Sequence, residues 1–451
     1  IRRRFSIGED SLSETVAAAE KTHAVLPADV PKDQPSWALM STCVHCGLCL
    51  NHCPTYKTLR MEMDSPRGRI YQVLQVMDGN LEVGESFTKH IDRCLGCLAC
   101  ETACPSGVQY GKIVERARAQ IENQYRRPFF VRTVRGFMYG KVLRNFGLLR
   151  FMARSMRLYQ RSGAQTLLRK SGVLKLMGLA DMDRLAPRID SEFFFSEIGK
   201  VFPAVGEKRG KIAFLAGCIN NVAFSHLNTA TVKVLTQNGI EVHIPQGQGC
   251  CGALHAHAGF RDAARELARN NINVFLGGDF DAIVTNAAGC GSTLKEYNDL
   301  LEHDPQFVAR AGQFVAKVKD ITEYLAQVGL REVKTKLNRK VAYQDACHLA
   351  HAQKVRAAPR ELLKSIGCEV VELPHADQCC GSAGVYNVAQ NELSMRILEA
   401  KMDDVSAVAS SAQMLVTANV GCLIQLRAGL DKRKMQMPVR HIVELLDEAY
   451  S

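Results

Sequence analysis

Three features common in other protein classes are missing from this chain of 451 residues. No stretch approaches the roughly 20 consecutive apolar residues that a membrane-spanning helix needs. No apolar run follows the opening residues Ile1 to Arg4, so a secretory signal peptide is not expected. Neither Arg67-Gly68-Arg69 nor the stretch Cys-Cys-Gly-Ser-Ala-Gly at 379–384 has the glycine spacing of a Rossmann or Walker loop, so we predict no nucleotide-binding site.

Acidic residues are absent from one long segment. None lies between Glu122 and Asp181, where Lys and Arg contribute +13, while the whole chain has a net charge of +11 and its remainder is therefore slightly negative. Apolar side chains alternate with these arginines, which predicts two or three amphipathic helices. We expect the helices to break at the glycines of the segment, namely Gly136, Gly140, Gly147 and Gly163.

The composition of this basic segment leaves more than one interpretation open. The first is a solvated helical linker docked on its neighbours. The second is a peripheral contact with anionic lipid or a quinone-bearing membrane, which basic amphipathic helices favour. Nucleic-acid binding is disfavoured because no nucleic-acid-binding fold accompanies the charge. We therefore expect no nucleic-acid partner, and the charge alone does not decide between the first two interpretations.

Cysteine, in contrast, is abundant. Eight of the 17 cysteines form two copies of the run C-x-x-C-x-x-C-x-x-x-C-P. This run is typical of ferredoxins with two [4Fe-4S] clusters, in which the fourth cysteine of each run binds the other cluster. Structural zinc more often uses paired ligands, so zinc is the weaker alternative. The predicted ligands are Cys43, Cys46, Cys49 and Cys104 for cluster 1, and Cys94, Cys97, Cys100 and Cys53 for cluster 2.

The two runs indicate an electron-carrying protein with a helical ferredoxin domain. The segment between them predicts a helix that Ser65 caps and Pro66 begins, with Ile70 and Val73 at helical spacing. This pattern favours a helical ferredoxin, with cluster-binding loops between helices, over the small β-rich form of ferredoxin. Because iron–sulfur ligation needs free thiolates, we expect a reducing cytoplasm.

The other cysteines expose a duplication in the second half of the chain. Each copy has a single cysteine, an adjacent pair followed by glycine 32 positions later, and one further cysteine. Flanking segments match as well, with KIAFLAGC corresponding to KVAYQDAC and AIVTNAAGC to MLVTANVGC. The cysteines are Cys218, Cys250, Cys251 and Cys290 in the first copy, and Cys347, Cys379, Cys380 and Cys422 in the second.

Strand-like apolar runs alternate with helical patterns in both copies, which predicts two α/β units with parallel sheets. Ligands of such sheets bind at the carboxyl ends of strands, where the single and the last cysteines are expected. Each copy therefore offers four thiolates for a further iron–sulfur cluster or another metal, and the alternative is a structural or vestigial set. Nearby histidines are expected to lie beside the thiolates or on the surface rather than to bind metal. They are His255, His257, His348, His351 and His375.

These patterns predict a multidomain α and α/β protein. A lead-in at 1–38, expected to form a short helix and then extended chain, precedes a helical ferredoxin domain with two [4Fe-4S] clusters at 39–124. A basic amphipathic helical linker spans 125–208. Two tandem α/β cysteine-rich domains, here called CCG domains after their Cys-Cys-Gly motif, occupy 209–335 and 336–451.

From about Cys43 to the C-terminus the chain resembles the iron–sulfur subunit of glycolate oxidase. The two ferredoxin runs, DSPRGRIYQVLQVMDGN, AAGCGSTLKEY and CCGSAGVYNV support the resemblance. It implies that a partner subunit with FAD oxidises glycolate, while this chain passes electrons to a quinone or another acceptor and has no catalytic residue of its own. The chain shows no flavin fingerprint and no base–nucleophile pair, which agrees with this division. The expected location is the cytoplasm or the inner face of the cell membrane.

Related families include the iron–sulfur subunits of D-lactate and glycerol-3-phosphate dehydrogenases and the catalytic subunit of heterodisulfide reductase, and these are the alternative functions. In heterodisulfide reductase-type domains the last cysteine begins a C-x-x-C motif. Here Thr293 and Gln425 stand at its second position. The loss of a thiolate from each copy argues against disulfide chemistry.

Overall fold

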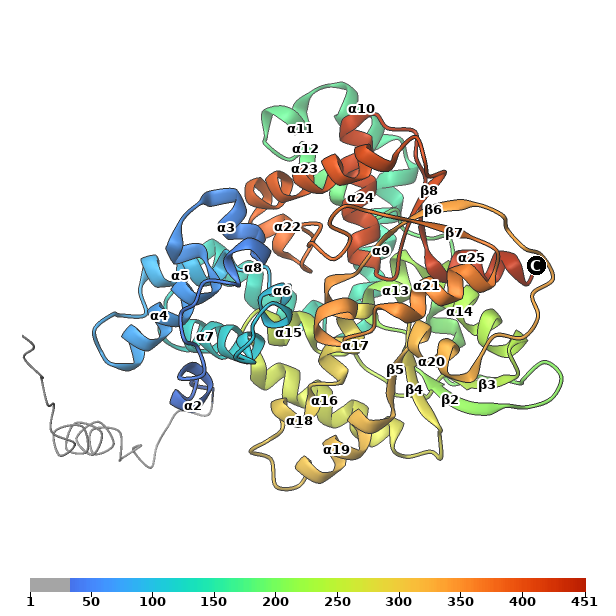
Figure 1. The fold of residues 1–451 in the computed structure, drawn as a ribbon, viewed down its shortest axis with the longest axis horizontal. Helices are drawn as coiled ribbons and strands as arrows, with labels where there is room; N and C mark the ends of the chain where they lie inside the picture. Colours follow the sequence, from blue (N-terminus) through green and yellow to red (C-terminus); the bar gives the residue numbers. More distant parts are fainter. Residues whose placement is uncertain (1–32) are drawn as a thin grey trace, which may run out of the picture.

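The computed structural model describes residues 33–451, so most of the predicted lead-in at 1–38 lies outside the described residues. Figure 1 shows a helical N-terminal part, coloured blue to cyan, beside two α/β units. The predicted fold class is confirmed: a helical ferredoxin-like region precedes two sheet-containing cysteine-rich domains. Among residues 33–451 there is no helix with both the length and the apolar character needed to cross a membrane.

Short helices surround the two ferredoxin runs, and residues 33–124 contain no strand. As predicted, a helix begins at Pro66, where the Ser65 side chain accepts a hydrogen bond from the amide of Gly68. Ile70 and Val73 of this helix enter a small local core. The elements are α2 (Trp37–Met40), η1 (Leu50–His52), α3 (Pro54–Leu59), η2 (Glu62–Asp64), α4 (Pro66–Met77), α5 (Glu85–Asp92), α6 (Ala99–Thr102) and α7 (Tyr110–Gln124).

The basic segment is helical, but the expected breaks at Gly136, Gly140 and Gly147 were wrong, because all three lie inside helical segments. A glycine inside a helix costs only about 1 kcal/mol, which neighbouring contacts offset. Gly163, with φ +82°, does separate two helices. The elements are α8 (Phe129–Phe137), the π-helical turn η3 (Met138–Val142), α9 (Phe146–Arg161), α10 (Ala164–Lys170), α11 (Val173–Leu176), α12 (Ala180–Leu185) and η4 (Phe194–Glu197).

The basic segment combines docked charge with exposed apolar surface. Arg127 forms ion pairs with Asp92 and Glu122, which fix the start of the segment against the ferredoxin-like region. Helix α8 buries none of its residues, and Phe129 and Phe130 are 75% and 76% exposed. Both features predicted for an amphipathic linker are therefore present.

The first CCG domain contains a five-stranded sheet in the order β1-β3-β2-β4-β5. The sheet is parallel except for β1, which pairs antiparallel with β3 and comes from the range expected to be linker. Its strands are β1 (Val201–Phe202), β2 (Gly210–Phe214), β3 (Ile240–His243), β4 (Ala282–Thr285) and β5 (Val318–Asp320). Its helices are α13 (Cys218–Ala223), α14 (Ser225–Gln237), α15 (Ala253–His257), α16 (Arg261–Phe275), α17 (Ala288–Leu294), α18 (Tyr297–Leu300), α19 (Val308–Lys317) and α20 (Ile321–Val328).

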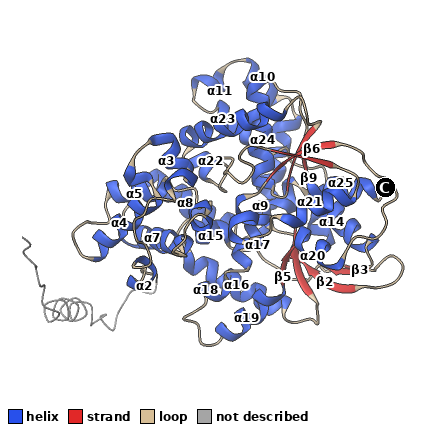
Figure 2. Cartoon of the chain, in the orientation of Figure 1, coloured by secondary structure: helices blue, strands red, loops and turns tan. Residues whose placement is uncertain are grey.

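The second CCG domain repeats this topology with an all-parallel sheet in the order β7-β6-β8-β9. Helix α14 packs against α25 and α20 against α21, so the two sheets share one hydrophobic core (Figure 2). The strands are β6 (Lys340–Gln344), β7 (Glu369–Glu372), β8 (Met414–Thr417) and β9 (Val439–His441). The helical elements are η5 (His348–Ala352), α21 (Ala357–Ser365), α22 (Tyr386–Ala389), α23 (Asn391–Val408), α24 (Val420–Arg433) and α25 (Ile442–Ala449).

The repeated topology brings the cysteines of each copy to one edge of its sheet. In the first copy they follow the carboxyl ends of β2, β3 and β4, which are neighbours in the sheet. In the second copy they follow β6, β7 and β8 in the same way. This is the edge at which parallel sheets bind ligands.

Candidate iron–sulfur sites

The four cysteines predicted for cluster 2 line one cavity of about 290 Å³. Each is at most 8% exposed. The amide of Gly96 donates a hydrogen bond to Cys94 Sγ at 3.3 Å, and the Tyr110 hydroxyl donates to the same sulfur at 3.5 Å. Buried soft thiolates around a cavity, with donors directed at sulfur, fit an iron–sulfur cluster. The four residues are Cys53 from the first run and Cys94, Cys97 and Cys100 from the second.

The thiols predicted for cluster 2 surround a cavity. Within residues 33–451, no three His, Cys, Asp or Glu side chains are grouped closely enough to hold a single metal ion. A structural zinc site needs four ligands at about 2.0 to 2.3 Å from one centre. The arrangement around the cavity of cluster 2 suits a polynuclear cluster better than zinc.

The cysteines predicted for cluster 1 lie closer to the surface. Cys46 is exposed, and Cys43, Cys49 and Cys104 are half-buried. Partial burial raises the pKa of the Cys43 thiol, and negative charge on the neighbouring Cys104 and Cys46 raises it further. Cys104 of the second run therefore lies next to Cys43 of the first run.

A buried arginine beside the cavity of cluster 2 was missed by the sequence analysis. Arg69 is 1% exposed; its Nε donates to the carbonyl of His90 at 2.7 Å, and both Nη atoms donate to Thr55 Oγ1 at 3.2 Å. Thr55 Oγ1 in turn contacts Cys53 Sγ at 3.1 Å. Burial raises the pKa of the Cys53 thiol, and the positive charge of Arg69 opposes this effect. Arg69 thus favours negative charge at the cluster 2 site.

The carboxylate of Asp64 neutralises this arginine. Asp64 is fully buried and lies 3.5 Å from Arg69 Nη2, 3.0 Å from His90 Nδ1 and 2.9 Å from Arg93 Nη1. These groups come from the segment between the two cysteine runs and from α5 and its end. The segment between the two cysteine runs therefore contributes a buried ionic network that fixes α3, α4 and α5 around the cluster 2 site.

In the first CCG domain the four cysteines come together below the sheet edge. The Cys218 and Cys250 sulfurs are 3.5 Å apart, and Cys251 interacts with Cys290. The cysteine pair is fixed through its carbonyls, because Asn271 donates to Cys250 O at 2.9 Å and the Tyr297 hydroxyl donates to Cys251 O at 2.8 Å. Gly252 follows with φ +84°, a left-handed conformation that favours glycine.

The second CCG domain gathers its own four cysteines, each at most 8% exposed. The amide of Gly381 donates to Cys379 Sγ at 3.5 Å, and Asn419 Nδ2 donates to Cys422 Sγ at 3.7 Å. Gly381 has φ +92°, and a Cβ at this position would lie 2.6 Å from the carbonyl oxygen of Ser394. Glycine is therefore required there by both conformation and space.

The second CCG site directly adjoins the site of cluster 2. The Cys97 and Cys379 thiols are hydrogen-bonded, and this contact is the main cause of the lowered pKa of Cys97. Both residues belong to one buried apolar cluster with Cys347 and Tyr386, and the Tyr386 hydroxyl donates to Arg93 O at 2.9 Å. Among residues 33–451, this cluster includes no cysteine of the first CCG domain. The two copies therefore differ in their relation to the ferredoxin-like region.

A buried polar residue stands at the second position of the C-x-x-C motif in each copy. Gln425 is fully buried and is bound by Asn387 and Ser394, with Asn387 Nδ2 to Gln425 Oε1 at 3.2 Å and Gln425 Nε2 to Ser394 Oγ at 2.9 Å. Thr293 is 3% exposed, and its hydroxyl has no partner. Neither position supplies a metal ligand of the soft thiolate type.

Each of the five histidines near the cysteines contacts a specific sulfur or oxygen atom. His348 Nδ1 lies 3.5 Å from Cys347 Sγ, and His257 Nδ1 lies 2.7 Å from Glu115 Oε1. The other three bind oxygens elsewhere: His255 contacts Tyr139 O, His351 contacts Thr102 Oγ1 and Asp377 O, and His375 contacts Asp404.

Known protein families match most of the chain. Residues 212–295 and 341–427 match the cysteine-rich domain family, 39–108 the 4Fe-4S dicluster domain, and 130–186 the linker region of the glycolate oxidase iron–sulfur subunit. The chain is 40% identical over 415 residues to the probable glycolate oxidase iron–sulfur subunit of Bacillus subtilis (strain 168), which covers 90% of this chain and 93% of that protein. The chain belongs to the glycolate oxidase iron–sulfur subunit family.

Two other relatives are similar to this chain. The glycolate oxidase iron–sulfur subunit of Escherichia coli (strain K12) is 30% identical over 419 residues, covering 91% of this chain and 94% of that protein. Lactate utilization protein A of Geobacillus sp. (strain WCH70) is 30% identical over 239 residues, covering 52% of this chain and 99% of that protein. The resemblance stated from the sequence is confirmed, and the dicluster match implies two [4Fe-4S] clusters.

Proposed function

We propose that this chain is the electron-transfer subunit of a glycolate-oxidising complex. A partner subunit that binds FAD oxidises glycolate to glyoxylate, and this chain accepts the two electrons one at a time and passes them to a quinone or another acceptor. The observation that supports this most directly is the cavity lined by Cys53 and the three cysteines of the second run. Bound iron–sulfur clusters supply one-electron carriers, whereas the oxidation of a 2-hydroxy acid needs a two-electron group such as a flavin.

The ligand assignment follows the crossed pattern. Cluster 1 is bound at the half-exposed site and cluster 2 at the buried cavity, while a further iron–sulfur centre occupies the second CCG site beside Cys379. The exposure of Cys46 places cluster 1 where a partner subunit can approach, and the contact between Cys97 and Cys379 supports onward transfer from cluster 2. Electrons thus move from the partner's flavin through clusters 1 and 2 towards the second CCG domain.

The complex is expected in the cytoplasm, with contact to the inner face of the membrane through the basic segment. Exposed phenylalanines at Phe129 and Phe130 beside arginines suit an interfacial helix at an anionic surface. The proposed function does not depend on nucleic acid.

Co-expression with an FAD-binding partner subunit tests the proposed function. We expect the two chains to co-purify and to reduce ferricyanide with glycolate, and to be slower with D-lactate. This chain alone, loaded with clusters, should oxidise neither acid. Glycolate oxidation by this chain without the flavoprotein, or turnover of a disulfide with reduced dye, would contradict the proposal and favour a catalytic CCG site.

The unequal positions of the two CCG domains lead to a prediction with a matched pair of variants. Cys379→Ala should remove the spectroscopic signal of the further centre and slow electron flow to a quinone, because Cys379 adjoins Cys97. Cys250→Ala, at the equivalent position of the first copy, should leave the reduction of that centre by glycolate unchanged. Electron paramagnetic resonance (EPR) of the glycolate-reduced complex compares them. Equal effects of both variants would refute the asymmetric route.

A further inference from the structure

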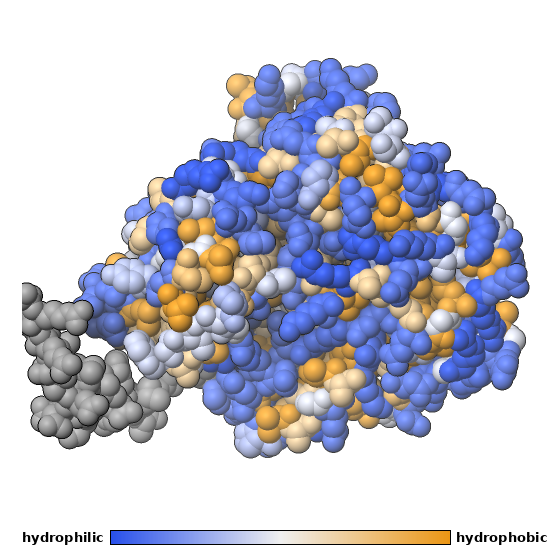
Figure 3. Space-filling model, in the orientation of Figure 1, coloured by the Kyte–Doolittle hydropathy of each residue, from blue (hydrophilic) through white to orange (hydrophobic). Residues whose placement is uncertain are grey.

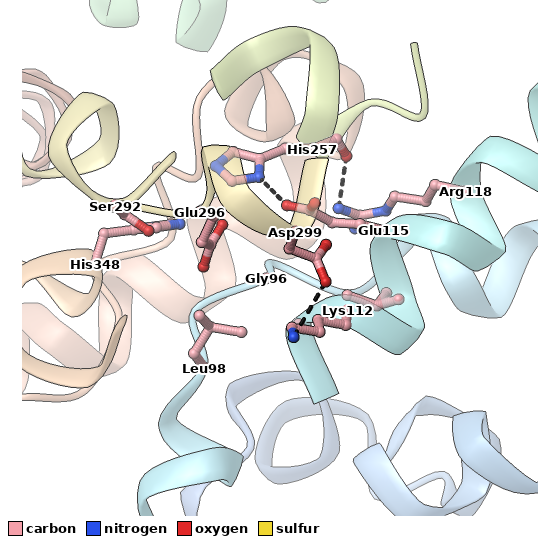
Figure 4. A pocket seen from close by; sticks show the side chains of 12 residues that line it. Gly96, Leu98, Lys112, Glu115, Arg118, His257, Ser292, Glu296, Asp299 and His348 are labelled. Carbon is pink, nitrogen blue, oxygen red and sulfur yellow. Dashed lines mark hydrogen bonds and ion pairs between the residues drawn. The ribbon is translucent and has the colours of Figure 1, made fainter. Parts of the chain in front are cut away.

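A pocket of about 450 Å³ lies where the ferredoxin-like region meets both CCG domains (Figure 4). Its lining comes from the cluster 2 loop, from α7, from α15, α17 and α18 of the first CCG domain, and from η5 of the second. Figure 3 shows the mixed polar and apolar surface of the molecule in the orientation of Figure 1.

The pocket borders both sets of redox cysteines. Gly96 and Leu98, which line it, flank Cys97 in the chain, and His348 follows Cys347. Arg118 of α7 links the cluster 2 loop to the first CCG domain. It donates one hydrogen bond to the carbonyl of Cys94 and another, at 2.8 Å, to the carbonyl of His257. Only the cysteine loop that holds cluster 2 therefore separates a molecule bound in this pocket from that cluster.

Two polar groups of the lining have no hydrogen-bond partner. Ser292 is 2% exposed and its hydroxyl is unpartnered. His257 uses Nδ1 to bind Glu115, while its Nε2 is buried without a partner. Figure 4 shows the bond to Glu115 on one side of the ring and the side chains of Glu296 and His348 on the other. Unsatisfied buried polar groups are destabilising, so a ligand that bonds to both is favoured.

A carboxyl group with a raised pKa lies in the same wall. Burial, and then repulsion from Glu115, Glu101 and Asp299, raises the pKa of Glu296 well above its ordinary value. Glu115 instead stays ionised, since its hydrogen bond to His257 and the charges of Arg261 and Arg118 outweigh burial and lower its pKa. At the rim, Lys112 pairs with Asp299 at 3.1 Å and is 39% exposed. The wall thus contains one carboxyl group with a raised pKa and one hydrogen-bonded His–Glu pair.

The duplication shows that the CCG fold does not require these polar groups. By the register of the cysteines, the other copy has Tyr386 in place of His257, Ile424 in place of Ser292 and Ala428 in place of Glu296. His348 of the second copy corresponds to Ile219 of the first. The polar groups are therefore specific to this junction and do not belong to the repeated fold.

We propose that this junction pocket binds the dicarbonyl head group of a quinone-type acceptor, with Ser292 and His257 bonding to its oxygens and Glu296 acting as a proton donor; this rests on the proposed function. Lys112 and Arg118 balance the charges of Glu115 and Asp299 in the lining, which suits an uncharged acceptor. Two electrons from glycolate, delivered singly through the clusters, and two protons convert the two carbonyl groups into hydroxyl groups. One proton comes from Glu296 and the other through the His257–Glu115 pair, and both are replaced from solvent at the Lys112 rim.

The test uses the complex with its flavoprotein partner and two acceptors. Ferricyanide takes one electron and no proton, whereas menadione and decylubiquinone take two electrons and two protons. Glu296→Gln should lower kcat for the quinones by about 10²-fold, the usual contribution of a positioned proton donor. Ser292→Ala should raise the KM for the quinones by about tenfold, as expected for one lost hydrogen bond of about 1.4 kcal/mol. Both should leave ferricyanide reduction unchanged.

Glu332→Gln, an exposed site remote from the pocket, is the matched charge control and should behave as the unmodified complex. Binding of decylubiquinone is measured independently from the change it causes in the cluster EPR line shape, which Ser292→Ala should weaken. Equal losses with quinone and ferricyanide, or unchanged quinone kinetics and binding, would overturn the pocket assignment. If the unmodified complex failed to reduce ferricyanide with glycolate, the proposed function would fail instead, so the two failures are distinguishable.

Discussion

Replacing Cys53 by Ala removes cluster 2 and leaves cluster 1 in place. Although Cys53 belongs to the first cysteine run, its side chain lines the same cavity as Cys94, Cys97 and Cys100. A cubane with only three cysteine ligands loses the corner iron or the whole cluster. We therefore expect the chain to lose the iron and acid-labile sulfide of one cluster, with the EPR signal of cluster 1 retained and electron flow from glycolate to quinone abolished.

The reciprocal variant is the control for this experiment. Cys104→Ala should remove cluster 1 and spare cluster 2, because Cys104 lies beside Cys43 of the first run. Mössbauer spectra and potentiometric EPR of both variants, prepared anaerobically, distinguish the two clusters. Loss of cluster 1 from Cys53→Ala and of cluster 2 from Cys104→Ala would refute the crossed assignment.

Replacing Arg69 by Gln should destabilise the ferredoxin-like region and lower the reduction potential of cluster 2. Arg69 is 1% exposed and bonds to Thr55, to the carbonyl of His90 and to the fully buried Asp64. Removing one partner of a buried ion pair costs about 3–5 kcal/mol, and Arg93 retains part of the compensation for Asp64, so about 3 kcal/mol is expected. Reduction adds negative charge to the cluster, so the loss of a nearby cation makes it less favourable.

Two further variants separate the effect of charge from that of packing. Arg69→Lys keeps the positive charge and should restore most of the potential without restoring all of the hydrogen bonds. Arg67→Gln breaks an ion pair with Glu62 that is 30% and 46% exposed, so it should cost no more than about 1 kcal/mol and leave the potential of cluster 2 unchanged. Denaturant unfolding and EPR-monitored redox titration measure both quantities. A potential that is the same in Arg69→Gln as in the unmodified chain would contradict the role of this charge.

Local and periodic features of the molecule could be predicted from the sequence. The cap at Ser65 and the helix from Pro66 depend on neighbouring residues, and the structure has both. The duplicated cysteine spacing predicted two α/β units, and both sheets have the same strand order around the cysteines. These predictions succeeded because turn chemistry, capping and hydrophobic period act over a few residues or repeat along the chain.

Features that depend on distant segments could not be predicted in this way. From the sequence, Arg67-Gly68-Arg69 was considered only as a phosphate-binding loop. The burial of Arg69 depends on its contacts with Asp64 and α5. The contact between Cys97 and Cys379 joins residues of separate domains, so no spacing rule indicates it. The junction pocket likewise combines three domains, although the appearance of Glu296 where the other copy has Ala428 was a signal that a comparison of the repeats could have found. The helix breaks predicted at Gly136, Gly140 and Gly147 were wrong because tertiary contacts outweigh the small free-energy cost of a glycine inside a helix.

The central claim is that electrons from glycolate pass through the clusters of this chain. Rapid-freeze EPR of the complex with its flavoprotein, mixed with glycolate in the absence of an acceptor, tests it most directly. The account predicts that the signals of reduced [4Fe-4S] clusters grow at least as fast as the steady-state turnover. A flavin that becomes fully reduced while the clusters stay oxidised over many turnover times would contradict the account.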